Sequence, residues 1–347
     1  MKYFTGIQTN LFLVILLLQG TTIIAQPFQL PEAVTNHAMV ILKRNNQDHL
    51  YTFYGLDSSK SWAGVHKKVF RLNLVTGKAQ RIADVPDSTG RLAPAASVVG
   101  NKAYIVGGYT VYADGKERSS RQLFIFDPST ETFSKGADLP FAIDDHVQAV
   151  SAKNLLYVIS GWSDSANVRT VQVYDPQNNN WKLATPLPNE PTAAVFGGCG
   201  IIVKDTIYFL GGAIFSKFYP PSRQFYKGVI NKKDPLHITW INAGEYPGEF
   251  RYRSVCFENK AEIYFWGGSN ETYNYDGIAY SDKGPVRPNT SVLIYDRKKG
   301  RLYTKTATNS RMDLRNIAKN SKGIWMIIGG MGPLQKPLNT LNRIRPD

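Results

Sequence analysis

Arginines and histidines recur at one position of a pattern that repeats along the chain. The position lies six residues after the proline of a Leu-Pro pair or its equivalent, just before a short apolar segment. If the repeats form a ring, these side chains face one narrow opening, where they would concentrate positive potential and suit a carboxylate, sulfate or phosphate. They could instead hydrogen-bond between neighbouring repeats. The basic residues at or beside this position are His37, Arg91, His146, Arg253 and Arg315.

The elements that would position these residues form six copies of one unit. In each copy a short apolar strand led by an aromatic residue runs into one or two glycines, and consecutive copies are 51 to 62 residues apart. A period near 50 is typical of a modular array, in which one copy is too small to bury its own apolar face. The six segments are residues 51–55, 104–108, 157–161, 208–212, 264–268 and 325–330.

Four short strands are predicted within each copy. In the second copy they lie at residues 95–99, 104–108 and 122–126 and from Phe133 onward, with Asp127-Pro128 as one of the turns. Asp-Pro favours a tight turn because the carboxylate bonds the backbone beyond it while proline fixes φ. Aromatic and β-branched strands between such turns predict a four-stranded antiparallel blade. We expect Phe133, like Trp181 in the third copy, to pack between adjacent blades.

The two ends of the chain predict how the ring closes. The sixth copy has a predicted third strand near residues 340–344, and residues near Gln26–Leu30 lead into a Leu-Pro pair as outer strands do elsewhere. We expect this N-terminal strand to complete the C-terminal blade, which would remove an exposed sheet edge. The predicted fold is all-β, a six-bladed β-propeller of four-stranded antiparallel blades.

Two long insertions depart from the regular repeat. Residues 213–238 and 269–289 follow the glycines of copies four and five and are rich in aromatic side chains, so both should rise over the same face of adjacent blades. Tyr273 and Tyr275, near Glu271, would suit stacking on a sugar ring combined with hydrogen bonding. Alternatively, the aromatic side chains pack the loops against the propeller.

The first 25 residues have the pattern of a secretory signal peptide. Lys2 is their one charged residue, residues 11–18 form an apolar run, and small residues lead to Ala25. The run is too short to span a bilayer. We expect cleavage after Ala25, leaving residues 26–347 as a secreted or periplasmic propeller that is not inserted in a membrane.

The charge balance favours anionic partners. Lys and Arg number 41 against 27 Asp and Glu, for a formal net charge of +14. Export and the absence of long basic runs argue against nucleic acid, so acidic carbohydrate or an anionic cell surface fits better, with plain solubility as the alternative. Cys199 and Cys256 should lie on equivalent strands of neighbouring repeats. Export permits a disulfide, but two buried free thiols are the preferred expectation.

The repeat resembles the Kelch repeat, in which an apolar strand runs into Gly-Gly and is followed by Tyr-Asp-Pro, an aromatic residue and Leu-Pro. The resemblance covers essentially all of residues 26–347 and leaves the function open, because propellers host unrelated activities. Some Kelch-like proteins are similar to galactose oxidase, whose copper site needs two His, two Tyr and a Cys-linked Tyr. Neither cysteine here stands in a matching context, and the five histidines lack metal-ligand spacing. We therefore expect no metal and no cofactor.

A second resemblance, in size and export signal, is to secreted six-bladed Kelch proteins that act as sialic acid mutarotases. Such a reaction implies a cation for the carboxylate of the sugar and an acid/base pair near the anomeric oxygen. The cations implied are Arg251, Arg253 and Arg315, and the candidates for proton transfer are Asp145, His146, Glu249 and Glu271.

Three functions remain open on the sequence alone. The first prediction is a secreted Kelch propeller that binds a glycan or other anionic small ligand at the channel mouth, without catalysis. The alternative is a mutarotase or epimerase of an acidic sugar such as N-acetylneuraminate. The third is a protein-interaction scaffold whose partner contacts the looped face. We expect a monomer.

Overall fold

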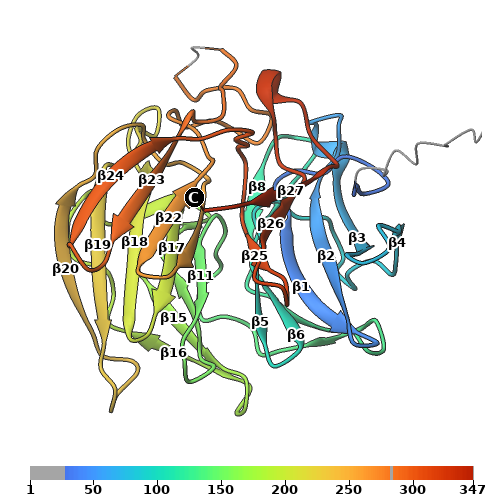
Figure 1. The fold of residues 1–347 in the computed structure, drawn as a ribbon, viewed down its shortest axis with the longest axis horizontal. Helices are drawn as coiled ribbons and strands as arrows, with labels where there is room; N and C mark the ends of the chain where they lie inside the picture. Colours follow the sequence, from blue (N-terminus) through green and yellow to red (C-terminus); the bar gives the residue numbers. More distant parts are fainter. Residues whose placement is uncertain (1–27, 282–283, 347) are drawn as a thin grey trace, which may run out of the picture.

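Six antiparallel sheets stand side by side around a central channel in the computed structural model, which describes residues 28–281 and 284–346 (Figure 1). Five sheets have four strands and the sixth has three. These described residues contain no α-helix, and none of their helical turns is long and apolar enough to cross a membrane. The predicted all-β, six-bladed propeller is confirmed.

The blades follow one another in chain order, each with its first strand nearest the axis. Blade 1 consists of β1 (Ala38–Arg44), β2 (Gln47–Leu56), β3 (Val65–Asn73) and β4 (Ala79–Arg81). Blade 2 consists of β5 (Ala95–Val99), β6 (Lys102–Val106), β9 (Leu123–Asp127) and β10 (Thr132–Lys135). Blade 3 consists of β11 (Val147–Val150), β12 (Leu156–Ile159), β15 (Val171–Asp175) and β16 (Asn180–Ala184). Blade 4 consists of β17 (Val195–Val203), β18 (Thr206–Ile214), β19 (Gln224–Ile230) and β20 (Ile238–Glu245). Blade 5 consists of β21 (Val255–Asn259), β22 (Glu262–Trp266), β23 (Ser291–Asp296) and β24 (Arg301–Thr306). Blade 6 consists of β25 (Ala318–Lys319), β26 (Trp325–Ile328) and β27 (Leu341–Ile344).

The repeated glycines fix the spacing between blades. Gly108 (φ +89°) donates its backbone N–H to the carbonyl of Ile143, in the loop that leads into the next blade, at 3.0 Å. A Cβ built on the neighbouring Gly107 would lie 2.3 Å from the same carbonyl oxygen, so a side chain would push the two blades apart. The equivalent bond occurs at all six junctions, and Gly330 donates to Val34 at 3.0 Å where blade 6 meets blade 1.

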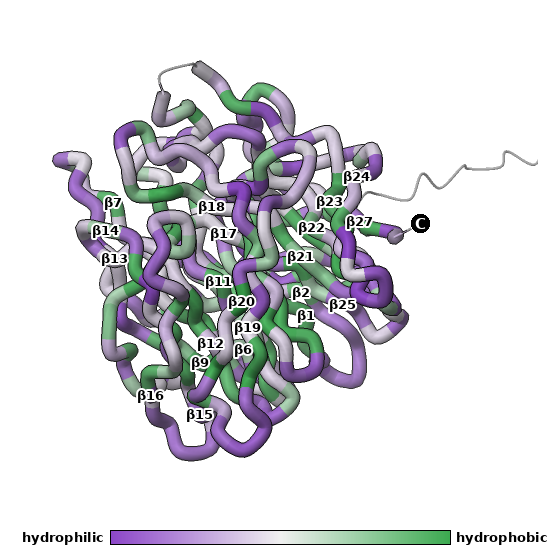
Figure 2. Tube along the Cα trace, turned by 90° about the vertical axis from the view of Figure 1, so that its left-hand side faces the viewer, coloured by the Kyte–Doolittle hydropathy of each residue, from purple (hydrophilic) through white to green (hydrophobic). Residues whose placement is uncertain are grey.

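Aromatic side chains fill the spaces between blades. Phe133 lies 4.9 Å from Phe126 in its own blade and 6.1 Å from Phe53 in blade 1, measured between ring centroids. Trp181 of blade 3 donates its indole N–H to the carbonyl of Ala137, which follows the last strand of blade 2, at 2.8 Å. Both residues pack between blades as predicted. Figure 2 shows the hydrophobic segments gathered along the strands and the hydrophilic ones in the loops.

The N-terminal residues contact the outer edge of blade 6. Gln29 forms an isolated bridge with Thr340, the N–H of Leu341 donates to Phe28 at 2.8 Å, and that of Leu30 donates to Asn339 at 2.8 Å. This contact is a single bridge beside a three-stranded sheet, so closure by a full N-terminal strand stays a prediction. The predicted signal peptide and residues 26–27 lie outside the described residues.

One face of the propeller carries the loops that join the second and third strands of each blade and the loops that join consecutive blades; we call it the looped face. Its short elements are the ribbons β7 (Tyr109–Val111) with β8 (Glu117–Ser119) and β13 (Trp162–Ser163) with β14 (Ala166–Asn167), and the 3-10 turns η1 (Trp62–Gly64) and η2 (Pro333–Gln335). The blade 5 insertion rises above the sheets at the top of Figure 1.

The predicted insertion at residues 213–238 is shorter in the structure than expected. β18 extends to Ile214 and β19 begins at Gln224, so the loop itself covers residues 215–223. The aromatic residues Phe225 and Tyr226 belong to β19, where both are buried against the core. Consecutive residues of a strand point to opposite faces of its sheet. Each face of this blade packs against a neighbouring blade, so both side chains meet apolar neighbours.

Candidate functional site

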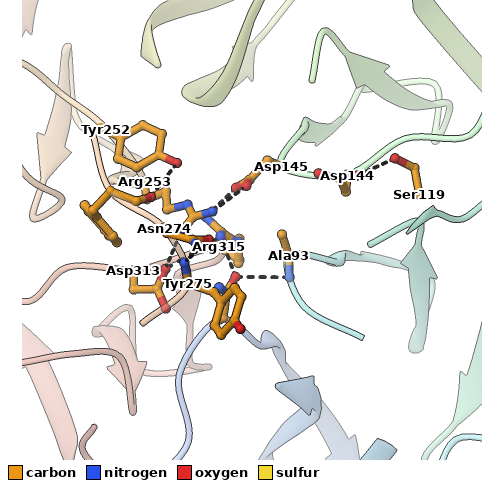
Figure 3. A network of polar contacts seen from close by, with 12 residues as sticks. Ala93, Ser119, Asp144, Asp145, Tyr252, Arg253, Asn274, Tyr275, Asp313 and Arg315 are labelled. Carbon is orange, nitrogen blue, oxygen red and sulfur yellow. Dashed lines mark hydrogen bonds and ion pairs between the residues drawn. The ribbon is translucent and has the colours of Figure 1, made fainter. Parts of the chain in front are cut away.

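A buried network of four charged side chains closes the channel beneath the looped face (Figure 3). Arg253 contacts Asp145 at 2.7 Å and Asp313 at 3.1 Å. Arg315 contacts the same two carboxylates, Asp145 at 2.8 Å and Asp313 at 3.6 Å. Each of the four side chains is at most 4% exposed. Two positive and two negative charges thus balance one another away from solvent.

Neutral side chains link this network to blade 1. The Thr35 hydroxyl donates to Asp313 at 2.6 Å. The side-chain oxygen of Asn36 accepts from the guanidinium of Arg315 and, at 3.0 Å, from the backbone N–H of Ala93. Buried ions are more stable when their remaining lone pairs and protons are also bonded. These contacts satisfy part of the network, while the Nε atoms of Arg253 and Arg315 are buried without a hydrogen-bond partner. The network joins loops of blades 1, 2, 3, 5 and 6.

A series of backbone hydrogen bonds around the axis holds the network in place. At the entry to each of the six blades one residue adopts a left-handed conformation, and we call these residues the ring positions. Backbone hydrogen bonds link the ring positions of blades 1 to 5, and the N–H of Leu314, beside the ring position of blade 6, donates to Arg253 at 3.1 Å. The N–H of Asp145 donates to Ala93 at 3.3 Å, and the N–H of Arg253 donates to Gly197 at 2.8 Å. The residues are Asn36 (φ 58°), Ala93 (φ 51°), Asp145 (φ 48°), Gly197 (φ 64°), Arg253 (φ 51°) and Asp313 (φ 59°).

Left-handed backbone is costly for residues other than glycine, and such residues concentrate at functional sites. Here five of the six ring positions are not glycine, and three of them carry the charged groups of the network. The conformation turns these three side chains toward the axis, where they meet (Figure 3).

The other predicted basic residues make contacts inside the protein. Arg91 pairs with Asp87 and donates to the carbonyl of Gly107 at 3.0 Å. Arg251 is fully buried and donates to the backbone and hydroxyl oxygens of Ser291, both at 2.9 Å. These are the hydrogen bonds between and within blades that the sequence left open as the alternative. Ligand binding by these arginines stays a prediction.

Both predicted histidines are uncharged at neutral pH. Burial lowers the pKa of His37 to about 3 and that of His146 to about 4, and the positive charge of Arg315 adds to the shift in both. They therefore add no positive potential at the channel mouth. The two residues stand at the start of blades 1 and 3, directly after Asn36 and Asp145.

The remaining predicted residues lie in or near the blade 5 insertion. Glu249 accepts from the backbone N–H groups of Thr290 and Ser291 at 3.1 and 2.8 Å and so anchors one end of the insertion. Glu271 is exposed. Tyr273, a residue of the insertion, is fully buried with its ring 5.0 Å from that of Tyr252.

The insertion spans the looped-face end of the channel. The Thr272 hydroxyl donates to Tyr219 of blade 4 at 2.7 Å, and Lys60 of blade 1 donates to the carbonyl of Asp276 at 3.0 Å. Gln335 of blade 6 donates to Val286 at 2.5 Å. The half-buried Tyr275 packs beside Val111 of blade 2. The insertion therefore covers the ion network and holds it away from solvent.

Glu117 is a candidate residue that the sequence did not indicate. It lies on β8, where it pairs with Val111, and the next pair of the ribbon is Tyr109 with Ser119. Alternate residues of a strand share a face, so Glu117 lies on the same face as Ser119, whose hydroxyl donates to Asp144 at 2.6 Å. This face of the ribbon is directed toward the ion network.

The carboxyl group of Glu117 has an unusual pKa for a residue that solvent reaches. Desolvation by the surrounding protein raises its pKa to about 7; Arg253 opposes the shift and Asp145 adds to it. A carboxyl group with a raised pKa, on a residue that solvent reaches, can donate or accept a proton.

Aromatic side chains from three blades lie together on the looped face near this ribbon. Trp162 lies 5.6 Å from Phe215 and 5.9 Å from Tyr219, and Tyr219 lies 4.8 Å from Tyr280 of the insertion. Phe215 is 54% exposed. We call Trp162, Phe215, Tyr219 and Tyr280 the mouth aromatics. The charge of Glu117 affects the pKa of Tyr280, which places the carboxyl group near one end of this row.

The described residues show no metal site and no disulfide. Within residues 28–281 and 284–346, no three His, Cys, Asp or Glu side chains are grouped so that they could hold a metal ion. Cys199 is buried, Cys256 is half-buried where the sequence favoured a buried thiol, and both are free thiols.

Comparisons with known proteins place the chain among repeat propellers. A family model, the KLHDC2/KLHL20/DRC7 Kelch-repeats domain, matches residues 7–212. Beta-scruin of Limulus polyphemus is 26% identical over 244 residues, which cover 68% of this chain and 24% of that protein. Kelch-like protein 25 of Xenopus tropicalis is 27% identical over 210 residues, which cover 57% of this chain and 32% of that protein.

The chain thus spans about a quarter to a third of the length of these curated relatives. A solved structure of YjhT superposes with a TM-score of 0.73, covering 92% of this chain and 97% of that one. Its sequence identity is 13%, so the likeness shows a shared fold.

Proposed function

The chain belongs to the Kelch-repeat β-propeller family, and from that premise we propose that it binds a carbohydrate on the looped face. The site lies between the mouth aromatics and Glu117. The observation that carries the proposal is a row of aromatic rings, with Phe215 exposed and the other three half-buried, beside a solvent-accessible carboxyl group. Sugars bind by stacking their apolar face on an aromatic ring while their hydroxyl groups bond to polar side chains.

The charge of the site narrows the kind of sugar. Arg253 and Arg315 are balanced by Asp145 and Asp313 and covered by the insertion, so they offer no free cation at the surface. Glu117 itself is negative when deprotonated. We therefore propose an uncharged sugar ring as the ligand, in place of the acidic ligand that the overall charge of +14 favours.

A second candidate function is acid/base catalysis on such a sugar, because the pKa of Glu117 is raised to about 7. Interconversion of sugar anomers requires that the anomeric hydroxyl loses a proton while the ring oxygen gains one. A carboxyl group that titrates near the working pH is suited to both transfers.

A protein partner is the third candidate, and exposed apolar residues of the looped face favour it. Trp62, Tyr112, Phe218 and Leu334 are each at least 43% exposed, and they come from the loops of four different blades. Exposed apolar side chains gathered on one face mark interaction surfaces.

Saturation-transfer NMR tests the carbohydrate site. The probes are methyl glucoside, N-acetylglucosamine, glucuronate and N-acetylneuraminate, and the variants are Phe215→Ala and Glu117→Gln. We expect an uncharged sugar to bind and each variant to weaken its binding about fivefold, the effect of one lost contact of about 1 kcal/mol. Phe141→Ala is the matched control, because Phe141 is 46% exposed on the same face but lies outside the mouth aromatics.

The outcomes separate the three candidates. Preferential binding of the two acids would overturn the uncharged ligand. Faster anomer exchange that disappears in Glu117→Gln would establish catalysis. No binding of any probe, with a protein captured through the looped face, would favour the scaffold.

A further inference from the structure

We propose that the central channel is a second binding site, entered from the face opposite the looped face, for a small uncharged amphiphile with an aliphatic body and a hydroxyl or amide head. This site is separate from the carbohydrate site, because the ion network and the blade 5 insertion lie between them.

The channel is large enough for such a molecule. The cavity has a volume of about 490 Å³ and is lined by the innermost strands of all six blades. Binding sites for small molecules are of this size and are mostly apolar, with a few polar groups that orient the ligand. The apolar lining comes from residues such as Ile41, Val98, Val150, Ile202, Val255 and Ile317.

Two buried polar groups at the inner end of the cavity have no partner. The Ser254 hydroxyl and the Nδ1 atom of His146 form no hydrogen bond, and the two residues are 5% and 6% exposed. Leaving a buried polar group unpaired costs about 1 to 3 kcal/mol. Both residues line the cavity, and the two atoms themselves are covered in the free protein. A polar group of a bound molecule can satisfy them once the side chains rotate toward the cavity.

The hydrogen bonds of Gln148 set the tautomer of His146. Gln148 donates its amide N–H to the carbonyl of Tyr104 at 2.9 Å, which leaves its oxygen to accept from Nε2 of His146 at 3.3 Å. Nε2 therefore carries the proton, and Nδ1 is an acceptor. A head group must donate to His146, and it can accept from Ser254. A hydroxyl or amide does both, whereas a carboxylate only accepts.

Electrostatics at the inner end also disfavour a carboxylate. Arg315 lines this end of the cavity, but it is paired with Asp145 and Asp313. The network as a whole is neutral, and His146 is uncharged. An anion placed here would lose its hydration without gaining a free positive charge.

The entrance lies at the other end of the inner strands. Lys319 is exposed and lines the cavity, with its ammonium group 5.3 Å from the centroid of the half-buried Trp325 ring. At the looped face the channel is closed by side chains that are at most 4% exposed. A ligand therefore enters with its head first and leaves its aliphatic end near Trp325.

Isothermal titration calorimetry of the folded chain with octanamide and octanoate tests the site. We expect octanamide to bind and octanoate to bind at least about tenfold more weakly. Ser254→Ala should weaken octanamide about fivefold through the loss of one hydrogen bond. The matched control is Ser310→Ala, because the Ser310 hydroxyl is also buried without a partner but does not line the cavity.

Neither serine substitution removes an existing hydrogen bond, so both variants should fold. Val150→Trp, which places a large side chain in the channel wall, should abolish binding. The proposal is overturned if octanamide does not bind, if octanoate binds equally well, or if Ser254→Ala binds as tightly as the wild type. Glu117→Gln should leave octanamide binding unchanged, which separates this site from the carbohydrate site.

Discussion

Arg253 and Asp145 meet at the channel axis with a guanidinium nitrogen 2.7 Å from a carboxylate oxygen, although 108 residues separate them in the chain. One belongs to the loop before blade 5 and the other to the loop before blade 3. Their pairing, shared with Asp313 and Arg315, joins opposite sides of the ring at its centre. The network thus acts as a structural closure of the propeller.

Removal of one charge from this network should destabilise the fold. Arg253→Met leaves Asp145 and Asp313 buried with one cation for two carboxylates, so the free energy of unfolding should fall by about 3 to 5 kcal/mol. Urea denaturation followed by fluorescence measures the change.

The matched control is Arg81→Ala, which breaks an exposed pair with Asp84 and should cost less than about 1 kcal/mol. An Arg253→Met variant that is as stable as the wild type but loses sugar binding would show instead that this arginine serves a ligand.

The left-handed backbone at the ring positions predicts that a glycine substitution there does not destabilise the protein. Ala93 is held at φ 51°, a conformation that costs about 1 to 2 kcal/mol for a residue with a Cβ. Ala93→Gly should therefore leave the free energy of unfolding unchanged or raise it by up to about 1 kcal/mol. Ala96→Gly, three residues later in β5, should lower it, because glycine weakens a regular strand. Equal losses in the two variants would contradict strain at Ala93.

Stability should fall in mild acid because two histidines are buried in the neutral form. The pKa values of His37 and His146 are lowered from 6.5 to about 3 and about 4. Between these values and pH 6.5 the unfolded chain binds more protons than the folded one, so stability is complete above pH 6.5 and is lost as the pH falls.

Each histidine contributes a slope of at most about 1.4 kcal/mol per pH unit in this window. Urea denaturation at intervals from pH 7 to pH 5 measures it. His146→Gln should reduce the slope, whereas His237→Asn, which replaces an exposed histidine, should not. An unchanged slope in His146→Gln would contradict the buried neutral form.

The sequence predicted the fold well because each repeated glycine stands at a contact between blades that has no room for a side chain. Each one bonds the loop before the next blade, and a side chain there would collide with that loop. Six copies of such a constraint imply six blades, whatever the surrounding residues are. The aromatic residues between blades, Phe133 and Trp181, follow from the same register.

The channel mouth was harder to predict, since a fixed count after Leu-Pro assumes loops of equal length. In blade 4 the ring residue is Gly197, three positions after the expected Ala194, and in blade 6 it is Asp313, two positions before Arg315. The sequence also gave no sign that arginines from blades 5 and 6 pair with aspartates from blades 3 and 6. Such pairs form only when the ring closes.

Glu117 escaped sequence reasoning because Gly108 and Gly161, on either side of its loop, are 53 residues apart, the same spacing as between Gly55 and Gly108. Its direction depends on the pairing of β7 with β8, in particular on Ser119 bonding Asp144. Alternation of side chains around the turn at residues 112–116 was the one signal that could have placed it. The alternation shows which way Glu117 points only when the strand paired with it is known.

The final prediction concerns the titration of Glu117. Carboxyl carbon NMR should show one glutamate with a midpoint near pH 7, because desolvation raises the pKa of this group to about 7. The resonance should disappear in Glu117→Gln and shift toward lower pH in Asp145→Asn, which removes a negative charge that adds to the raised pKa. Glu271, exposed on the same face, provides the comparison through Glu271→Gln, which should leave the midpoint unchanged. If Glu117 titrates near pH 4.5, it is ionised at neutral pH, and its role in sugar binding reduces to that of a hydrogen-bond acceptor.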